Sequence, residues 1–366
     1  MPDPRITKLA KVLVHYSLQI KPGQLVILET TPLAEELSLA FYEEALKAGA
    51  HILFQNRIPG AEEVFLKNAS DEQLDFEMPV RRQVYETFDA RLYIEAESNT
   101  RVLAGVDPEH IARYRKARAP LFKLFIDRLA KGEMKWCGTV YPTNAMAQEA
   151  NMSLSDYREF VYAAGMLNEE DPVTCWKKVA AQQQTLIEWL AGRKQAVLKG
   201  ENVDLSMSIE GRTFIPCAGE ENFPDGEIFT SPVEDSVNGW IQFKYPAIFD
   251  GNEVEDIELW FEKGKVVKEK AGKNQELLTS LLDTDPGARY LGEWGIGTNY
   301  GITRFTKNML FDEKIGGTIH LAVGLGFVEA GGNNESVLHW DMLCDMAEAE
   351  ITIDGELFYK NGKPVI

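Results

Sequence analysis

Hydrophobic and polar positions follow two different patterns along the chain, and the change between them divides the sequence in two. Up to about residue 192, short apolar runs such as LVILET and HILFQ alternate with amphipathic stretches of helical period. Beyond it, segments such as VDLSMSI, NGWIQFKYPAIF and DIELWFEKGKVVKEK are short, rich in β-branched and aromatic residues, and broken by Gly, Asn and Asp. The first half is therefore predicted to alternate strands with helices, and the second to consist mainly of strands.

The early part of the chain contains a strand, a helix and a strand in direct succession. KPGQLVILET predicts a turn and a strand, TPLAEELSLAFYEEALKAGA a helix that Gly49 closes, and HILFQ the next strand. This order predicts a parallel pair joined by a right-handed crossover. Helices are also expected between Gly60 and Tyr85 and over residues 107–132, with strands in ARLYIEAES and MKWCGTVYP. The first half is thus predicted to be an α/β domain with an open, mostly parallel sheet.

A long helix is predicted where the pattern changes. In DPVTCWKKVAAQQQTLIEWLAGRKQ, Asp171 can cap the start, Pro172 suits the first helical position, and Gly192 lies near the end. We place the domain boundary just after it, which gives an N-terminal domain of residues 1–194 and a C-terminal domain of residues 195–366. The second is predicted to be α+β, mainly antiparallel sheet or barrel, with one helix around NQELLTSLLDT.

Composition narrows the class of protein. The length of 366 residues suggests about two domains, and 45% hydrophobic with 26% charged residues is typical of a soluble globular protein. A net charge of −19 argues against a nucleic-acid partner, because binding to phosphates draws on clusters of Lys and Arg. No stretch has the form of a signal peptide or reaches the roughly 18 apolar residues of a membrane span. We therefore expect a cytoplasmic protein without a membrane partner.

The cysteines do not indicate a structural or metal-binding role. Cys137, Cys175, Cys217 and Cys344 are scattered, and no two of them have CxxC spacing. Reduced, mostly buried thiols are expected, with neither a disulfide framework nor a thiolate zinc site.

Candidate chemistry gathers near the C-terminus. In GGNNESVLHWDML, His339 and Asp341 lie two residues apart, so on a strand both side chains point to the same face. His320, in GTIHLAVG, lies 19 positions earlier on another predicted strand, and a hairpin or crossover could bring the two histidines together. Each motif alone has an ordinary explanation, a His–Asp hydrogen bond at a sheet edge or a histidine packed in the core.

Acidic side chains extend this set. Glu227 follows the turn FPDG, where solvent exposure would be ordinary, and Asp312 and Glu313 lie in FDEKIGG. Glu293 stands out because its surroundings, YLGEWGIGTN, are nearly all apolar or glycine. Burying an unpaired carboxylate there would be unfavourable, so it needs a cation. Imidazole and carboxylate groups together form a mixed nitrogen and oxygen ligand set, which indicates a metal-dependent hydrolase.

Four of these motifs occur together in a recognisable order. PDGEIFTSP, LGEWGIGTN, NMLFDEKIGGTIHLAVG and GGNNESVLHWDM span about 120 residues, and in this order the chain resembles the M29 family of metallo-aminopeptidases, the aminopeptidase T or thermophilic aminopeptidase group. KPGQLVILETTP and ALKAGAHILF extend the resemblance through the first half. The resemblance implies a peptidase that releases N-terminal amino acids from peptides with a free N-terminus, and it implies a homodimer.

The resemblance also implies where the chemistry lies. The C-terminal domain would be catalytic and bind two divalent metal ions, zinc, cobalt or manganese, which activate a water molecule. No other cofactor is expected. Glu293 would bridge the ions, and Glu313 or Glu293 would take and return the proton. Carried over motif by motif, the implied metal ligands are Glu227, Glu293, Glu313, His320, His339 and Asp341.

One position departs from the family pattern. Seven residues after His320, where the family resembled most often has a tyrosine, this chain has Phe327. A phenyl ring cannot donate a hydrogen bond to a developing oxyanion, and losing one such donor typically costs about a hundredfold or more in rate. Tyr300, in GTNYGI, is expected to be a packed aromatic residue rather than a substitute.

Three alternatives stay open beside an aminopeptidase. One is a related metallohydrolase that acts on another amide substrate. The second is a metal-binding protein with weak or no turnover, for which Phe327 is the distinguishing feature. The third is a nucleotide-binding protein, but no GxGxxG or Walker A sequence follows any strand of the first half, so the usual phosphate cradle is absent from the sequence.

Overall fold

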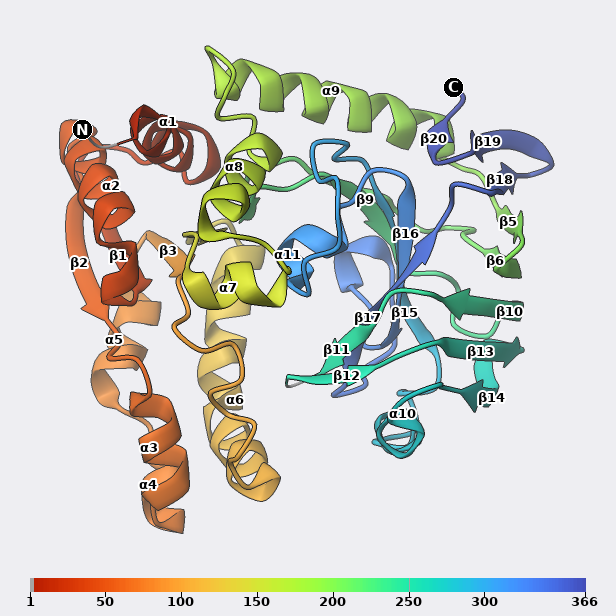
Figure 1. Ribbon diagram of the computed structural model, residues 1–366, viewed down its shortest axis with the longest axis horizontal. Coiled ribbons are helices and arrows are strands. Elements are labelled where there is room, and N and C mark those ends of the chain that lie inside the picture. Colours follow the sequence, from red (N-terminus) through yellow and green to blue (C-terminus); the bar gives the residue numbers. More distant parts are fainter. Residues whose placement is uncertain (1–2, 250) are drawn as a thin grey trace. The chain divides into compact units, whose positions relative to one another are not determined.

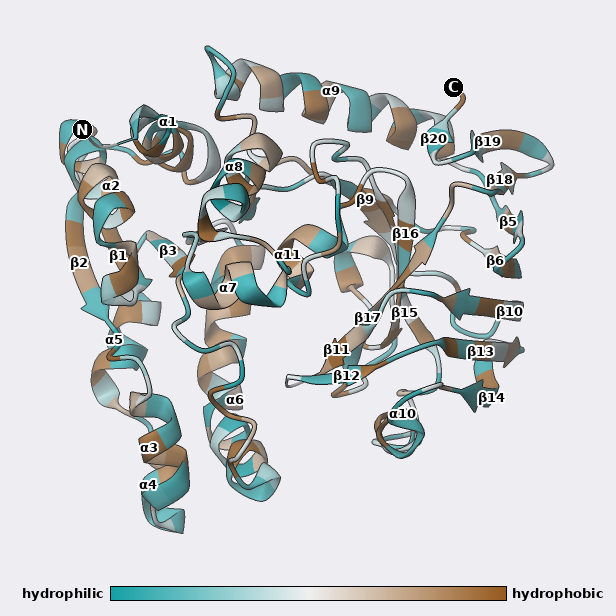
Figure 2. Ribbon diagram, in the orientation of Figure 1, coloured by the Kyte–Doolittle hydropathy of each residue, from teal (hydrophilic) through white to brown (hydrophobic). Residues whose placement is uncertain are grey.

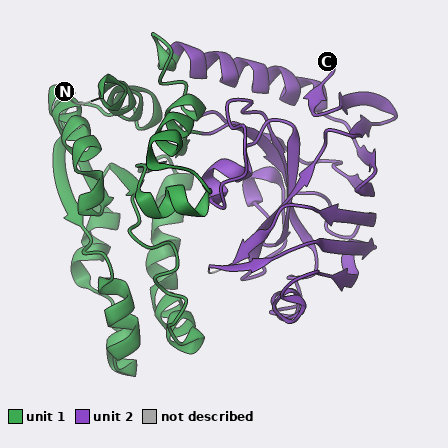
Figure 3. Cartoon of the chain, viewed as in Figure 1, with its two compact units in different colours: residues 1–173, 219–224 green, residues 174–218, 225–366 purple. Residues whose placement is uncertain are grey.

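The computed structural model describes residues 3–249 and 251–366, and the chain forms two compact units (Figure 1, Figure 3). Unit 1 comprises residues 1–173 and 219–224, and unit 2 comprises residues 174–218 and 225–366. The ranges 1–194 and 195–366, predicted from the sequence as domains with separate functions, stay a prediction.

Unit 1 is built on a five-stranded sheet with the strand order β2-β1-β3-β4-β8, and all four neighbouring pairs are parallel. The strands are β1 (Leu25–Thr30), β2 (His51–Asn56), β3 (Ala90–Glu95), β4 (Lys135–Val140) and β8 (Asn222–Phe223). The helices are α1 (Pro4–Val12), α2 (Glu35–Lys47), α3 (Ala61–Asn68), α4 (Asp71–Asp75), α5 (Pro79–Thr87), α6 (Pro108–Ala130), α7 (Asn144–Glu149) and α8 (Leu154–Ala164), with a π-helical turn at Leu13–Ser17 and a 3-10 turn at Pro32–Ala34.

The order of the strands makes this sheet doubly wound. The chain moves from β1 through α2 to β2 in one direction across the sheet, and from β3 through α6 to β4 in the other. Right-handed crossovers in opposite directions place α2 and α6 on opposite faces. On the α6 face, Ile27 packs with Tyr85, Leu121, Phe125 and Met134. The predicted open α/β architecture with a parallel sheet is confirmed.

Unit 2 contains two larger antiparallel sheets around one core. The first has eight strands in the order β14-β13-β10-β6-β5-β18-β19-β20, and the second has five in the order β17-β16-β15-β9-β7. The first comprises β5 (Gln195–Gly200), β6 (Val203–Ser208), β10 (Asn238–Phe243), β13 (Ile257–Glu262), β14 (Lys265–Lys270), β18 (Ala349–Ile353), β19 (Glu356–Lys360) and β20 (Lys363–Pro364). The second comprises β7 (Ile215–Cys217), β9 (Glu227–Thr230), β15 (Leu291–Gly297), β16 (Thr318–Gly324) and β17 (His339–Asp345).

The remaining elements of unit 2 are few. They are the hairpin β11 (Ala247–Phe249) and β12 (Asn252–Val254), the 3-10 turn Val328–Ala330, and the helices α9 (Pro172–Leu190), α10 (Gln275–Leu282) and α11 (Met309–Asp312). Hydrophilic and hydrophobic residues alternate along α9 (Figure 2), as the predicted amphipathic helix requires. The prediction of an α+β second half built mainly of antiparallel sheet is confirmed.

The five-stranded sheet of unit 2 presents two different faces. On β16 and β17, and on β15 from Trp294 onward, every second residue enters the hydrophobic core, among them Trp294 and Ile296 of β15, Leu321 of β16, and Trp340 and Met342 of β17. Because side chains alternate along a strand, the residues between them point to the opposite face. That opposite face carries the candidate chemistry.

Within residues 3–249 and 251–366, no helix is both long and apolar enough to cross a membrane.

Candidate metal centre

Antiparallel pairing places most of the predicted site residues in adjacent rows on one face of the five-stranded sheet of unit 2. Glu293 of β15 pairs with Ala322 of β16, and Ala322 pairs with Asp341 of β17, so the two carboxylates flank one small side chain. His320 lies two residues before Ala322, and His339 lies two residues before Asp341. The period of two along each strand and the register across the strands therefore bring these four side chains to one face.

Glu227 joins the same face from β9, where it pairs with Gly297 of β15. Between these rows lies Gly295, which pairs with His320 on one side and Phe229 on the other. A Cβ atom at residue 295 would lie 2.0 Å from Cε1 and Nε2 of His320. The absence of a side chain at Gly295 therefore leaves the space that the imidazole of His320 occupies next to the carboxylates.

This contact predicts the effect of Gly295→Ala. The methyl group displaces the imidazole of His320 without changing a candidate ligand, so metal affinity is expected to fall about 10–100-fold, the range usual for residues that orient a ligand. Competition with a metallochromic chelator measures it. Gly105→Ala is the matched control, since its added Cβ would meet no atom closer than 3.5 Å. Equal affinities in the two variants would contradict the assigned position of His320.

The side chains form two overlapping groups. In the first, Glu227, Glu293 and His320 each offer an atom within 4.8 Å of the others, and in the second Glu293, His339 and Asp341 do so. His320 Nε2 lies 3.3 Å from Glu293 Oε1, and His339 Nε2 lies 3.2 Å from Glu293 Oε2. Glu293 thus belongs to both groups and directs one oxygen to each histidine.

Main-chain carbonyls fix the orientation of both imidazoles. Nδ1 of His320 lies 3.0 Å from the carbonyl oxygen of Glu313, and Nδ1 of His339 lies 3.1 Å from that of Leu325. A carbonyl oxygen only accepts, so Nδ1 must be the protonated nitrogen that donates. In a neutral ring Nε2 then carries the lone pair, and in both rings it faces the carboxylates. This arrangement is common for histidines that bind metals.

Burial and charge oppose one another in this cluster. Burial raises the pKa of Glu227 to about 8, although the ammonium of Lys314 partly offsets it. Burial also opposes ionisation of Glu293 and Asp341, but the imidazoles outweigh it, so the pKa of Glu293 is lowered and that of Asp341 falls to about 2. Against the effect of burial, the carboxylates raise the pKa of His320 to about 10. The carboxylates of this cluster therefore stabilise a positive charge placed among them.

The donor set fits divalent metal ions. Glu227 Oε2 is buried and accepts no hydrogen bond from the described residues, although His320 Nε2 lies 3.3 Å away in a geometry unsuited to one. A buried acceptor without a donor is rare in proteins and calls for a cation. Imidazole and carboxylate ligands together suit zinc, cobalt or manganese.

Glu313 stands apart from both groups. Its Oε1 forms an ion pair with the neighbouring Lys314, and burial, with the charge of Asp341, raises its pKa. Asp312, beside it in sequence, accepts hydrogen bonds from the backbone N–H and hydroxyl of Thr306 at 2.7 and 2.9 Å. The structure thus separates the acidic pair. Glu313 contacts Lys314, which in turn contacts the candidate ligand Glu227, whereas Asp312 binds Thr306.

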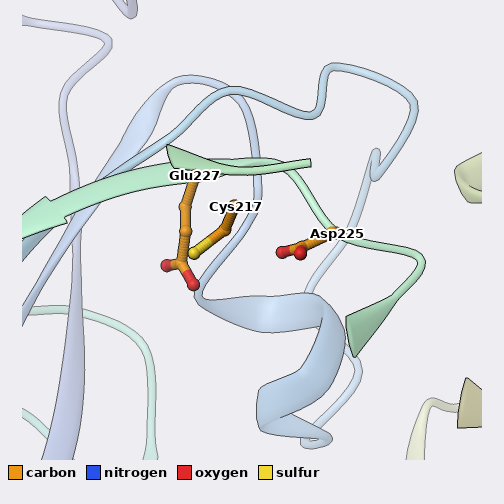
Figure 4. A group of neighbouring side chains, drawn as sticks. All are labelled: Cys217, Asp225 and Glu227. Carbon is orange, nitrogen blue, oxygen red and sulfur yellow. The ribbon is translucent and has the colours of Figure 1, made fainter. Parts of the chain in front are cut away.

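Three neighbouring residues were not identified from the sequence. Lys314 is fully buried and contacts Glu227, while Asp225 and Cys217 form a further group with Glu227 (Figure 4). Cys217 pairs with Glu227 between β7 and β9, so its side chain lies on the same face. The sequence contained only a weak indication of Lys314, because it is the single cation in the acidic segment FDEKIGG.

Comparison with known families identifies the family of this chain. The family described as Thermophilic metalloprotease (M29) matches residues 2–364. This chain belongs to the M29 family. The predicted family, and with it the predicted class of metal-dependent peptide-bond hydrolases, is confirmed.

Relatives resemble this M29 chain along almost its whole length. Aminopeptidase 2 of Geobacillus stearothermophilus is 28% identical, and the match covers 99% of this chain and 95% of that protein. Aminopeptidase AmpS of Bacillus subtilis is 26% identical with 98% coverage of both. The structure of wild-type AmpT from Thermus thermophilus superposes with a TM-score of 0.87 over 99% of each chain at 24% identity, which shows a shared fold.

Proposed function

We propose that this M29 protein is an aminopeptidase that releases N-terminal amino acids from peptides and holds two divalent metal ions. The observation that carries the proposal is the position of Glu293, whose two oxygens face two separate groups of candidate ligands. The relatives named as aminopeptidases support the choice of substrate. Zinc, cobalt and manganese are the candidate ions.

Each side chain has a defined part in this proposal. Glu227 and His320 would hold one ion, His339 and Asp341 the other, and Glu293 would be shared between them. When bound, such ions polarise the peptide carbonyl and lower the pKa of a water molecule. The carbonyl groups of Glu313 and Leu325, which orient the two imidazoles, would keep each Nε2 available to bind an ion.

Proton transfer is assigned to Glu313. Both oxygens of Glu293 face histidines, whereas Glu313 belongs to neither group of ligand atoms. Its raised pKa, caused first by burial, suits a carboxylate that takes a proton from water and returns it to the leaving amine. The resemblance also implies that Glu313 is a metal ligand, and this role stays a prediction.

Substrates with free and blocked ends test the specificity. Hydrolysis of aminoacyl p-nitroanilides and dipeptides is expected, while their N-acetylated counterparts are expected to be inert, because an aminopeptidase binds the free α-amine. Faster turnover of acylated amides than of free aminoacyl compounds would favour a different metallohydrolase.

Phe327 gives specific support to one alternative, a metal-binding protein with weak turnover. Its ring lies edge-on against that of His339, with 5.2 Å between the centroids, and against Phe229 at 5.1 Å. The position is therefore next to the candidate site, as the resemblance implies. The hydroxyl of Tyr300 donates to the carbonyl of Gly362 at 3.0 Å and is engaged there.

Phe327→Tyr tests whether a missing donor limits the rate. The new hydroxyl is expected to raise kcat by about tenfold or more with little change in metal content, since one transition-state hydrogen bond is typically worth at least that. Steady-state kinetics on an aminoacyl p-nitroanilide measures it, with Phe229→Tyr as the control that adds a hydroxyl to the neighbouring ring. Activity in Phe327→Tyr but not in the unmodified protein would favour the alternative of a metal-binding protein. If Phe327→Tyr gains no activity, the transition-state donor is supplied by another residue.

The assembly is also part of the proposal. A homodimer is expected, and light scattering coupled to size exclusion should give twice the mass of 41.2 kDa. A mass of one chain would remove the dimer from the proposal without affecting the metal centre.

A further inference from the structure

A third group of candidate ligands lies beside the two described. Cys217, Asp225 and Glu227 each offer one atom within 4.8 Å of the others, and in Figure 4 their side chains point toward one another. Glu227 belongs both to this group and to the group with Glu293 and His320. By its composition, one thiol and two carboxylates, the third group could attract another metal ion.

A side chain of the protein already supplies a positive charge at this place. Lys314 has no exposed surface, and its Nζ lies 3.4 Å from Glu227 Oε1 and 3.9 Å from Asp225 Oδ1. The same ammonium forms an ion pair with Glu313 Oε1. Three carboxylates, those of Glu227, Glu313 and Asp225, therefore face this one buried ammonium, and nearby opposite charges favour the charged form of a lysine.

We propose that the ammonium of Lys314 serves as the fixed cation of the third group, keeps metal ions out of it, and holds Glu227 by Oε1. The consequence for Glu227 is a division of its two oxygens. Oε1 faces Lys314, while Oε2, which accepts no hydrogen bond from the described residues, faces His320. Lys314 is thus a positioning residue, and its relevance to catalysis rests on the proposed function.

The charges of the cluster are consistent with this division. Five carboxylates surround the centre, those of Asp225, Glu227, Glu293, Glu313 and Asp341. One ammonium and two divalent ions would neutralise them. A third divalent ion beside Lys314 would leave an excess of positive charge and would repel the ammonium at short range, where the low dielectric strengthens the repulsion.

Cobalt provides a direct test, because a thiolate bound to Co²⁺ produces a sulfur-to-metal absorption band. The protein loaded with CoCl₂ is expected to lack any band that depends on Cys217. Lys314→Ala removes the ammonium and leaves space, so it is expected to bind an additional cobalt ion and gain the band. Lys314→Ala combined with Cys217→Ser should lack it again. Lys314→Met, which removes the charge but fills the space, should not gain it.

A second measurement needs no metal. Propylammonium matches the atoms that Lys314→Ala removes, and propanol matches their size without the charge. In the metal-free protein, propylammonium is expected to raise the Tm of Lys314→Ala more than propanol does, and to have no such effect on Lys314→Met. If Lys314→Ala does not fold unaided, the same comparison is made on the yield of refolding.

Three results would overturn the inference. They are a Cys217-dependent cobalt band in the unmodified protein, the absence of that band in folded Lys314→Ala, and equal effects of propylammonium and propanol. Failure of the unmodified protein to bind zinc, cobalt and manganese would instead contradict the proposed two-metal function, and the propylammonium comparison would still decide the position of the fixed cation.

Discussion

Replacing Glu293 with Gln is expected to abolish peptidase activity and to reduce the metal content from two ions to one or none. Glu293 is the residue that the two groups of candidate ligands share, and its two oxygens face His320 and His339 at 3.3 and 3.2 Å. An amide keeps the size of the side chain but removes the charge and one acceptor. Loss of a residue that merely orients a ligand costs about 10–100-fold, so loss of a shared ligand is expected to exceed that range.

Metal analysis of the purified variant and turnover of an aminoacyl p-nitroanilide measure the two effects separately. Glu335→Gln is the matched control, because Glu335 is exposed in the same unit and belongs to none of the candidate groups. Both effects should be absent from it. A Glu293→Gln protein that keeps two ions and full activity would show that the shared carboxylate is not a ligand.

Removal of metal by a chelator is the change with the second largest expected effect. Activity should be lost, and the Tm should fall, because the ions bind the folded cluster and have no preformed site in the unfolded chain. A ligand at a hundred times its Kd stabilises the folded state by about 2.7 kcal/mol, which corresponds to roughly 5–10 °C for a unit of this size. Differential scanning calorimetry with and without zinc or cobalt measures the shift.

The variant Glu293→Gln serves as the control for that shift. If the stabilisation comes from the candidate centre, the chelator should change the Tm of the variant much less than that of the unmodified protein. Equal shifts in both proteins would place the stabilising ion somewhere else in the chain.

The shared face of neighbouring candidate residues could be predicted from the sequence, because strand geometry is local. The period of two in VLHWDML is enough to place His339 and Asp341 on one face, and the apolar setting of Glu293 predicted a buried carboxylate that needs a cation. The same reasoning identified the parallel sheet of unit 1 from the succession of strand, helix and strand. It did not identify α7 and α8, although Thr143 and Ser153 cap their first turns through side-chain oxygens.

The register between strands was beyond the sequence. Glu227 and Glu293 come together because β9 and β15 pair with Glu227 opposite Gly297, and no local pattern specifies that alignment. Lys314 was missed for a related reason. A lysine between acidic residues and glycines normally lies in solvent, and only tertiary packing makes it one of the fully buried side chains. Its contacts with Asp225 and Glu227 therefore depend on residues far away in the sequence.

The carbonyl groups that hold the two imidazoles have a practical consequence for altering this centre. Any amino acid at positions 313 and 325 supplies the same acceptor, since the oxygen belongs to the peptide group rather than to Glu313 or Leu325 themselves. Side chains at these positions can consequently be exchanged without releasing the rings. An exchange at residue 325 thus leaves the acceptor of His339 in place, whereas an exchange at residue 313 keeps the acceptor of His320 but removes the ion pair with Lys314.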